Sequence, residues 1–144
     1  MNPLRPIVLA DDSEQDVELV LAALKRNNFA NPVTVARDGV EVLDYFHRRG
    51  RFAAEPPGLP LVLLLDLKMP RMDGLEVLRE LKGDDRHKTV PIVMLTSSRE
   101  EADLVKSYQL GVNAYVVKPV GFQQFVEAIR QTGAFWAAIN EPPP

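Results

Sequence analysis

The sequence predicts an α/β fold in which five parallel strands alternate with five helices. Four short apolar runs and one β-branched stretch alternate along the chain with segments whose apolar residues recur at helical spacing. The four apolar runs end directly in a polar side chain. The connections between the elements are mostly short, which favours right-handed crossovers and a parallel sheet covered by helices on both faces.

The first strand is expected at Ile7–Ala10, a wholly apolar run that ends at Asp11 and Asp12. Ser13 follows, with Asp16 three residues later, a spacing that resembles a capping box at the start of a helix. The apolar residues of this helix recur at helical spacing and are Val17, Val20, Leu21 and Leu24.

The second strand is expected at Val33–Val35, and the second helix follows Asp38 and Gly39. Residues Arg49–Pro60 are rich in glycine and proline, which predicts a loop. The apolar stripe of the second helix consists of Val40, Leu43 and either Phe46 or His47.

The third strand is expected at Leu61–Leu65, a continuous apolar run typical of a strand that is buried on both faces. It ends at Asp66, and a third helix with apolar positions follows Gly74. The fourth strand, Ile92–Leu95, has the same character and ends at Thr96. The apolar positions of the third helix are Leu75, Leu78 and Leu81.

A fourth helix is expected before Gly111, because Glu100, Glu101 and Asp103 would lie favourably at its positive end. The fifth strand, Ala114–Val117, ends at Lys118, and a fifth helix follows it. The flavodoxin-like strand order 2-1-3-4-5 is a standard arrangement for this number of elements. The apolar residues of the fifth helix are Phe122, Phe125, Val126 and Ile129.

Length and composition narrow the function classes. The 144 residues predict one domain, with a core at about 6–131 and an aromatic, proline-ended extension at 132–144. The sequence contains no cysteine, which excludes a disulfide framework, a thiolate zinc site and a cysteine nucleophile. The net charge of −3 argues against direct binding to nucleic acid, and the longest apolar run is too short to span a membrane. We therefore expect a cytoplasmic protein.

Polar residues follow the predicted strands at one edge of the sheet. Asp11, Asp12, Asp66, Thr96 and Lys118 should meet there, because the carboxyl ends of parallel strands share an edge. Clustered carboxylates suit Mg²⁺, and a metal beside a hydroxyl and an ammonium suits a phosphoryl group. A carboxylate can itself be the nucleophile, and Asp66, the central one, is the best candidate.

Each of these residues also fits an ordinary structural role. Asp11 and Asp12 precede a helix and can act as caps, and Asp66 can begin a turn. Thr96 can cap the fourth helix, and Lys118 can belong to a common loop. Their coincidence at the ends of successive strands favours a shared site.

Four segments resemble the receiver domains of two-component response regulators. They are Leu9–Ser13, Leu64–Pro70 with Asp73-Gly74, Met94–Ser97 and Gly111–Pro119. They occur in the family's order and spacing, and the resemblance extends over nearly the whole chain. Any one motif is weakly specific, whereas the set is highly specific.

The resemblance implies a role for each residue of the predicted site. Asp66 matches the phosphoacceptor, and Asp12 matches the direct ligand of Mg²⁺ (or Mn²⁺) beside it. The backbone carbonyl of Lys68 matches the third protein ligand, and Asp11 matches a carboxylate that acts through metal-bound water. Lys118 matches the lysine that pairs with the phosphoryl group.

The resemblance also implies a switch. Thr96 matches the hydroxyl that is drawn to the phosphoryl group, and Tyr115 matches the aromatic residue that then moves inward. This movement would alter the surface of helix 4, strand 5 and helix 5. The implied function is a single-domain response regulator in a phosphorelay, which catalyses only its own phosphorylation and dephosphorylation.

The long loop and the chain end resemble stand-alone regulators that partner bacterial phytochrome-type histidine kinases. The features that carry this resemblance are Arg49–Pro60, Phe135-Trp136 and Asn140–Pro143. The implied partners are a sensor histidine kinase of the bacteriophytochrome type and a second copy of the chain, joined as a homodimer through the aromatic tail. Phe135 and Trp136 can alternatively extend the core beside the fifth helix.

Three other functions compete with this interpretation. An aspartate-nucleophile phosphatase usually needs an acid two residues after the nucleophile, where this chain has Lys68. A flavodoxin needs a Ser/Thr-rich phosphate loop after the first strand, where this chain has Asp11 and Asp12. A pseudo-receiver scaffold is disfavoured because every expected site residue is present. His47 and His87 are expected to be incidental, because neither has a carboxylate or histidine partner at ligand spacing and a receiver needs neither.

Overall fold

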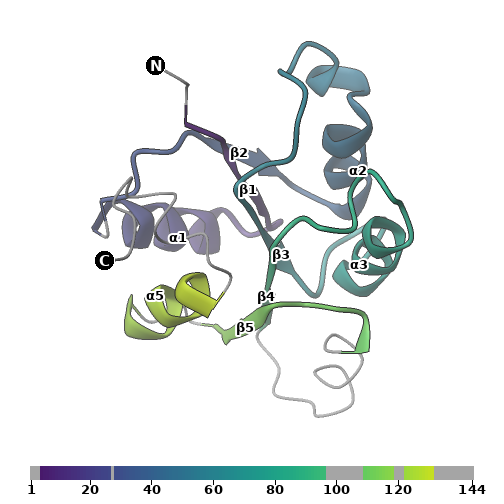
Figure 1. The fold of residues 1–144 in the computed structure, drawn as a ribbon. Coiled ribbons are helices and arrows are strands. Elements are labelled where there is room, and N and C mark those ends of the chain that lie inside the picture. Colours follow the sequence, from purple (N-terminus) through teal and green to yellow (C-terminus); the bar gives the residue numbers. More distant parts are fainter. Residues whose placement is uncertain (1–3, 27, 97–108, 119–121, 132–144) are drawn as a thin grey trace, which may run out of the picture.

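The computed structural model describes residues 4–26, 28–96, 109–118 and 122–131. Their elements form one five-stranded sheet with helices on both sides (Figure 1). In chain order the elements are β1 Ile7–Ala10, α1 Glu14–Arg26, β2 Val33–Ala36, α2 Gly39–His47, a 3₁₀ turn Gly50–Phe52, β3 Val62–Asp66, α3 Gly74–Lys82, β4 Ile92–Thr96, β5 Ala114–Val117 and α5 Phe122–Gln131.

The strands are all parallel, and their order is β2-β1-β3-β4-β5, which confirms the predicted flavodoxin-like arrangement. The three central strands are fully buried along their length. That burial explains why their sequences are continuously apolar rather than alternating.

Two hydrophobic cores cover the two faces of the sheet. One core joins α1 and α5 to strand residues such as Leu9 and Leu64. The other joins α2 and α3 to the residues of opposite parity, such as Ala10 and Leu65. Figure 1 shows the same division, with α1 and α5 on one side of the sheet and α2 and α3 on the other. Because successive side chains of a strand point to opposite faces, each strand contributes to both cores.

Several predicted details differ from the structure. Strand β3 begins at Val62, one residue later than expected. Leu21 was expected in the buried stripe of the first helix but is 38% exposed, so that stripe is narrower than its apolar spacing indicates. The predicted loop Arg49–Pro60 contains a 3₁₀ turn, because Phe52 is buried against Tyr45, with 5.6 Å between their ring centroids.

Two predicted features lie outside the described residues. These are most of the fourth helix, at 97–108, and the aromatic tail with Phe135 and Trp136. Among the helices that the structure describes, none combines the length and the apolar character needed to cross a membrane.

Candidate functional site

The parity of the strands explains why three side chains meet at the carboxyl edge of the sheet. The Asp66 side chain lies on the same side of β3 as that of Leu64, which packs in the core under α1 and α5. Asp11 follows Leu9 on β1 with the same parity, and Lys118 follows Val116 on β5. All three side chains therefore extend from one face of the sheet, the face covered by α1.

Lys118 is the centre of this arrangement. Its ammonium nitrogen Nζ lies 2.8 Å from Asp11 Oδ2, 2.8 Å from Asp16 Oδ2 and 3.2 Å from Asp66 Oδ2. The Lys118 side chain is only 10% exposed, and those of Asp11 and Asp66 are 0% and 6% exposed. We call Asp11, Asp12, Asp16, Asp66 and Lys118 the acidic rim.

Asp16 was not predicted as a site residue. The sequence placed it in a capping box with Ser13, and one half of that box is present, because Ser13 Oγ accepts the Asp16 backbone N–H at 3.2 Å. The other half differs, since the Ser13 N–H donates to Asp11 Oδ1 at 3.0 Å. The Asp16 carboxylate is thereby left to bind Lys118 at 2.8 Å. Its position three residues after a capping serine was the only sequence signal for it.

The electrostatics of the rim set the protonation of Asp66. Burial raises the pKa of Asp66 to about 6, although Lys118 opposes this rise and Asp11 adds to it. Burial alone would lower the pKa of Lys118, but the carboxylates of Asp11, Asp16 and Asp66 hold it well above its ordinary value. Near neutral pH the site therefore holds an ionised Asp66 beside a firmly charged lysine.

The three aspartates of the predicted metal site are brought together. Asp11, Asp12 and Asp66 each offer a carboxylate oxygen, and these oxygens lie within 4.8 Å of one another. The buried Asp11 Oδ2 contacts Lys118 but accepts no hydrogen bond of regular geometry. An oxygen donor set with such an incompletely satisfied buried atom fits a hard divalent cation.

The loop after β3 is packed tightly against the phosphoacceptor candidate. A side-chain Cβ on Gly74 would lie 2.4 Å from the Asp66 carbonyl oxygen, so only glycine fits there. Asp73 caps α3 by accepting the Glu76 N–H at 2.9 Å. Within the loop, the Lys68 N–H is directed at Asp66 Oδ1 over a longer 3.4 Å. The start of α3 thus holds the backbone of this loop in place.

Thr96 and Tyr115 lie on the opposite face from the three charged strand-end residues. Thr96 is the last residue of β4 and is fully buried, and its register partner on β5 is Val117. Tyr115 is two residues before Val117, so Thr96 and Tyr115 share a face. Tyr115 is 38% exposed, at the surface of the edge strand.

A second polar cluster lies elsewhere in the fold and corrects the sequence interpretation of the histidines. His47, Asp84 and His87 each offer a ligand atom within 4.8 Å of the others. We call these three residues the histidine cluster. Asp84 lies only three residues before His87, and the packing of α2 beside α3 brings the distant His47 to both, so the histidines are not without partners.

Comparison with known proteins identifies one family. The model of the response regulator receiver domain matches residues 7–130. Response regulator Rcp1 of Synechocystis sp. is 34% identical over 135 residues, which are 94% of this chain and 90% of that protein.

Solved structures agree with this match. The bacteriophytochrome response regulator AtBRR is 57% identical, with 97% of this chain and 100% of that chain covered and a TM-score of 0.87. The Mn²⁺-bound form of Rcp1 is 32% identical, with coverage of 97% and 99% and a TM-score of 0.78. The phosphorylated cyanobacterial phytochrome response regulator RcpA is 33% identical, with 94% of both chains covered and a TM-score of 0.77.

Proposed function

Because this chain belongs to the response regulator receiver domain family and acts in two-component signalling, we propose that Asp66 is its phosphoacceptor. One observation carries this assignment. The Asp66 carboxylate is nearly buried at the carboxyl edge of the sheet and lies 3.2 Å from the Lys118 ammonium. A nucleophilic carboxylate beside a fixed cation is what an incoming phosphoryl group requires.

The acidic rim is proposed to hold a divalent cation. Asp12 and Asp66 would provide direct carboxylate ligands, the backbone carbonyl of Lys68 a third ligand, and Asp11 a contact through water. Mg²⁺ suits such oxygen donors, and Mn²⁺, which is bound in the related Rcp1 structure, suits the same set. When bound, the cation would neutralise negative charge on the phosphoryl oxygens.

Asp66 and Lys118 of the rim, together with Thr96, would have different roles in phosphoryl transfer. An Asp66 carboxylate oxygen attacks phosphorus, the bond between phosphorus and the imidazole nitrogen of a kinase phosphohistidine breaks, and the electron pair leaves with that nitrogen. Lys118 pairs with the charge on the transferred group, and the Thr96 hydroxyl donates a hydrogen bond to it. With the pKa of Asp66 near 6, the attacking carboxylate is ionised at neutral pH.

Phosphorylation is proposed to change the protein surface through β5, the edge strand of the sheet. Thr96 and Tyr115 share a face of the sheet, so movement of Thr96 toward the phosphoryl group changes the space open to Tyr115. This change would alter the surface formed by the fourth helix, β5 and α5. That surface would then bind a partner or a second copy of the chain.

The proposed partner is a sensor histidine kinase of the bacteriophytochrome class. This proposal is supported by the names of AtBRR and RcpA, which are respectively a bacteriophytochrome and a cyanobacterial phytochrome response regulator. We place the chain in the cytoplasm as a single receiver domain, with no direct contact to nucleic acid. A homodimer through residues 132–144 belongs to the same proposal.

A phosphotransfer experiment tests the assignment. The full chain is incubated with Mg²⁺ and a small phosphodonor such as acetyl phosphate, and intact-protein mass spectrometry measures the phosphorylated fraction. Wild type should become phosphorylated, whereas Asp66→Asn should stay unmodified. Asp85→Asn, which alters a highly exposed carboxylate paired only with Lys88 in the described structure, is the matched control and should behave as wild type. Full modification of Asp66→Asn would refute the assignment.

A further inference from the structure

The histidine cluster lies at the amino edge of the sheet, opposite the acidic rim. His47 is the last residue of α2, a helix that runs back from the carboxyl edge. Asp84 and His87 lie between the end of α3 and the start of β4, at the same edge. These are the only two histidines of the chain, and their ring centroids are 5.2 Å apart.

One nitrogen of His87 is buried without a hydrogen-bond partner. The residue is 7% exposed, and its Nδ1 atom has no hydrogen bond within the described structure. The backbone of Phe46 also interacts with the ring, and because Nδ1 is the nitrogen without a partner, we assign the N–H to Nε2. Nδ1 then presents an unused lone pair, and metal-binding histidines are commonly oriented by such a backbone contact.

The unused lone pair is directed at a carboxylate. His87 Nδ1 lies 3.3 Å from Asp84 Oδ2. Two ligand atoms of a tetrahedral zinc ion, each about 2.0–2.1 Å from the metal, are about 3.4 Å apart. A metal cation would satisfy both atoms.

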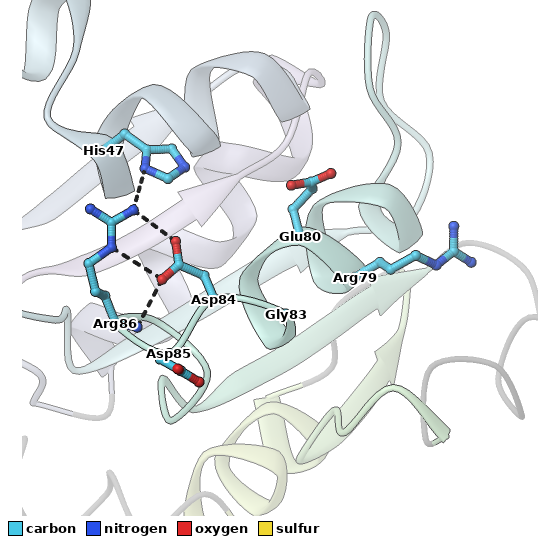
Figure 2. A pocket seen from close by; sticks show the side chains of 7 residues that line it. All are labelled: His47, Arg79, Glu80, Gly83, Asp84, Asp85 and Arg86. Carbon is cyan, nitrogen blue, oxygen red and sulfur yellow. Dashed lines mark hydrogen bonds and ion pairs between the residues drawn. The ribbon is translucent and has the colours of Figure 1, made fainter.

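The site already attracts a cation. Figure 2 shows the Arg86 guanidinium between the His47 ring and the Asp84 carboxylate. Its Nη2 atom is 2.9 Å from Asp84 Oδ2 and 3.4 Å from His47 Nδ1. The Arg86 side chain is 71% exposed, so it can leave for solvent without losing packing. Arg86 thus places its positive charge against two of the three ligand atoms, His47 Nδ1 and Asp84 Oδ2.

The cluster is accessible from outside. His47, Asp84 and Arg86 line an open pocket of about 660 Å³ (Figure 2). His47, Arg86 and His87 also line a second pocket of about 290 Å³, on the side of Pro57. A hydrated ion can therefore reach the ligand atoms, which a binding site requires in addition to ligand identity.

We propose that His47, Asp84 and His87 bind one transition-metal cation of the Zn²⁺ class, which replaces the Arg86 guanidinium. Two imidazole nitrogens and one carboxylate are the donors such a cation prefers, and they leave a fourth position for water. The bound ion would tie the end of α2 to the loop after α3. This site does not depend on the proposed phosphorylation, and its donors differ from the all-oxygen rim.

Zn²⁺ titration of the full chain in excess Mg²⁺ tests the proposal, since Mg²⁺ competes for the oxygen donors of the acidic rim. Isothermal titration calorimetry should give one Zn²⁺ per chain, and Co²⁺ should give the visible absorption of a four-coordinate site. His47→Gln removes a half-buried ligand and should weaken binding at least about 10-fold. Arg86→Gln removes the competing guanidinium and should tighten it.

Two controls separate this site from the rim. Asp12→Asn alters a rim carboxylate and should keep the Zn²⁺ affinity of wild type. Asp85→Asn alters an exposed carboxylate next to the cluster and should also leave it unchanged. Equal affinity in wild type and His47→Gln overturns the proposal, as does the absence of Zn²⁺ binding by wild type in excess Mg²⁺. A loss of Zn²⁺ binding in Asp12→Asn, with retention in His47→Gln, would assign the ion to the rim instead.

Discussion

The acidic rim and the histidine cluster lie at opposite edges of one sheet and are assembled by different means. The rim residues Asp11, Asp66 and Lys118 continue three strands on one face, so the register of the sheet places them together. The histidine cluster joins a helix end to a loop, so it depends on how α2 packs beside α3. The rim is thus part of the strand framework, whereas the cluster depends on the surface layer around it.

The two regions also differ in how far their cations are exposed to water. In the rim, Lys118 is nearly buried and contacts three carboxylates. In the histidine cluster, the cation is Arg86, which is 71% exposed. Because water screens exposed ion pairs and not buried ones, substitutions in the rim should have larger effects on stability.

The largest effect is expected from Lys118→Met. The change leaves Asp11, Asp16 and Asp66 without their shared cation, and breaking a buried pair in this way costs about 3–5 kcal/mol. Urea unfolding in EDTA at pH 7 measures it. Lys88→Met, which removes an exposed pair with Asp85, should change the free energy of unfolding by less than about 0.5 kcal/mol. Equal losses of unfolding free energy in Lys118→Met and Lys88→Met would contradict the expectation that the buried rim contributes more to stability than an exposed ion pair.

Asp66→Asn should stabilise the metal-free protein by about 1–3 kcal/mol at pH 7, because it removes a buried charge whose pKa is raised to about 6. The folded state binds the Asp66 proton more tightly than the unfolded state. This group's contribution to stability is therefore full below about pH 4 and is lost as the pH rises through 6. Unfolding measured between pH 4 and 7 in EDTA should show this decline in wild type and less of it in the variant. An unchanged pH profile would contradict the assignment of the burial penalty to Asp66.

Gly74→Ala should destabilise the fold by about 1–3 kcal/mol, because its Cβ would lie 2.4 Å from the Asp66 carbonyl oxygen. Phosphorylation by acetyl phosphate should also slow, since the loop after β3 must shift. Gly83→Ala, at the end of α3 beside the histidine cluster, should cost less than about 1 kcal/mol, because its nearest neighbour is 3.3 Å away. If Gly74→Ala and Gly83→Ala lose the same free energy of unfolding, the close approach of Gly74 to the Asp66 carbonyl does not explain the loss.

The smallest effect is expected from Asp84→Asn, and it should have the opposite pH dependence to Asp66→Asn. Hydrogen bonds from the Arg86 side chain and backbone hold the pKa of Asp84 well below its usual range. Its contribution is therefore present above about pH 4 and is lost as the pH falls further. Acid unfolding followed by circular dichroism should begin at a higher pH in Asp84→Asn than in wild type. If acid unfolding also begins at a higher pH in Asp85→Asn, the effect is not specific to Asp84.

The strands and most of the acidic rim could be predicted because both follow from local rules. Continuous apolar runs mark buried parallel strands, and the residue after each run must lie at the carboxyl edge. The rim residues Asp66 and Lys118 were predicted in this way, as was the position of Thr96 at the end of β4. Asp16 was missed because its sequence position explains it fully as a helix-start residue. Its contact with Lys118 exists only once α1 covers that face of the sheet.

The histidine cluster could not be predicted, for a different physical reason. His47 ends a helix and His87 lies in a loop, so neither strand register nor periodicity relates their positions. Their approach depends on the angle at which α2 and α3 pack and on the turn in which the His87 N–H donates to the Asp84 carbonyl at 2.9 Å. The burial of Phe52 in a predicted loop has the same origin, since contacts among surface layers are not encoded in local spacing.

The ion pair between Asp16 and Lys118 joins residues 102 positions apart in the chain. The first helix therefore reaches its counter-charge only after the last strand has been synthesised and paired. A nascent chain that still lacks β5 carries the aspartates of the rim without the lysine that neutralises them, and their repulsion opposes premature closure of that edge. Such long-range contacts form slowly because a large loop must close first. We therefore expect the charges that the proposed phosphorylation would use to make assembly of this edge a late event in folding.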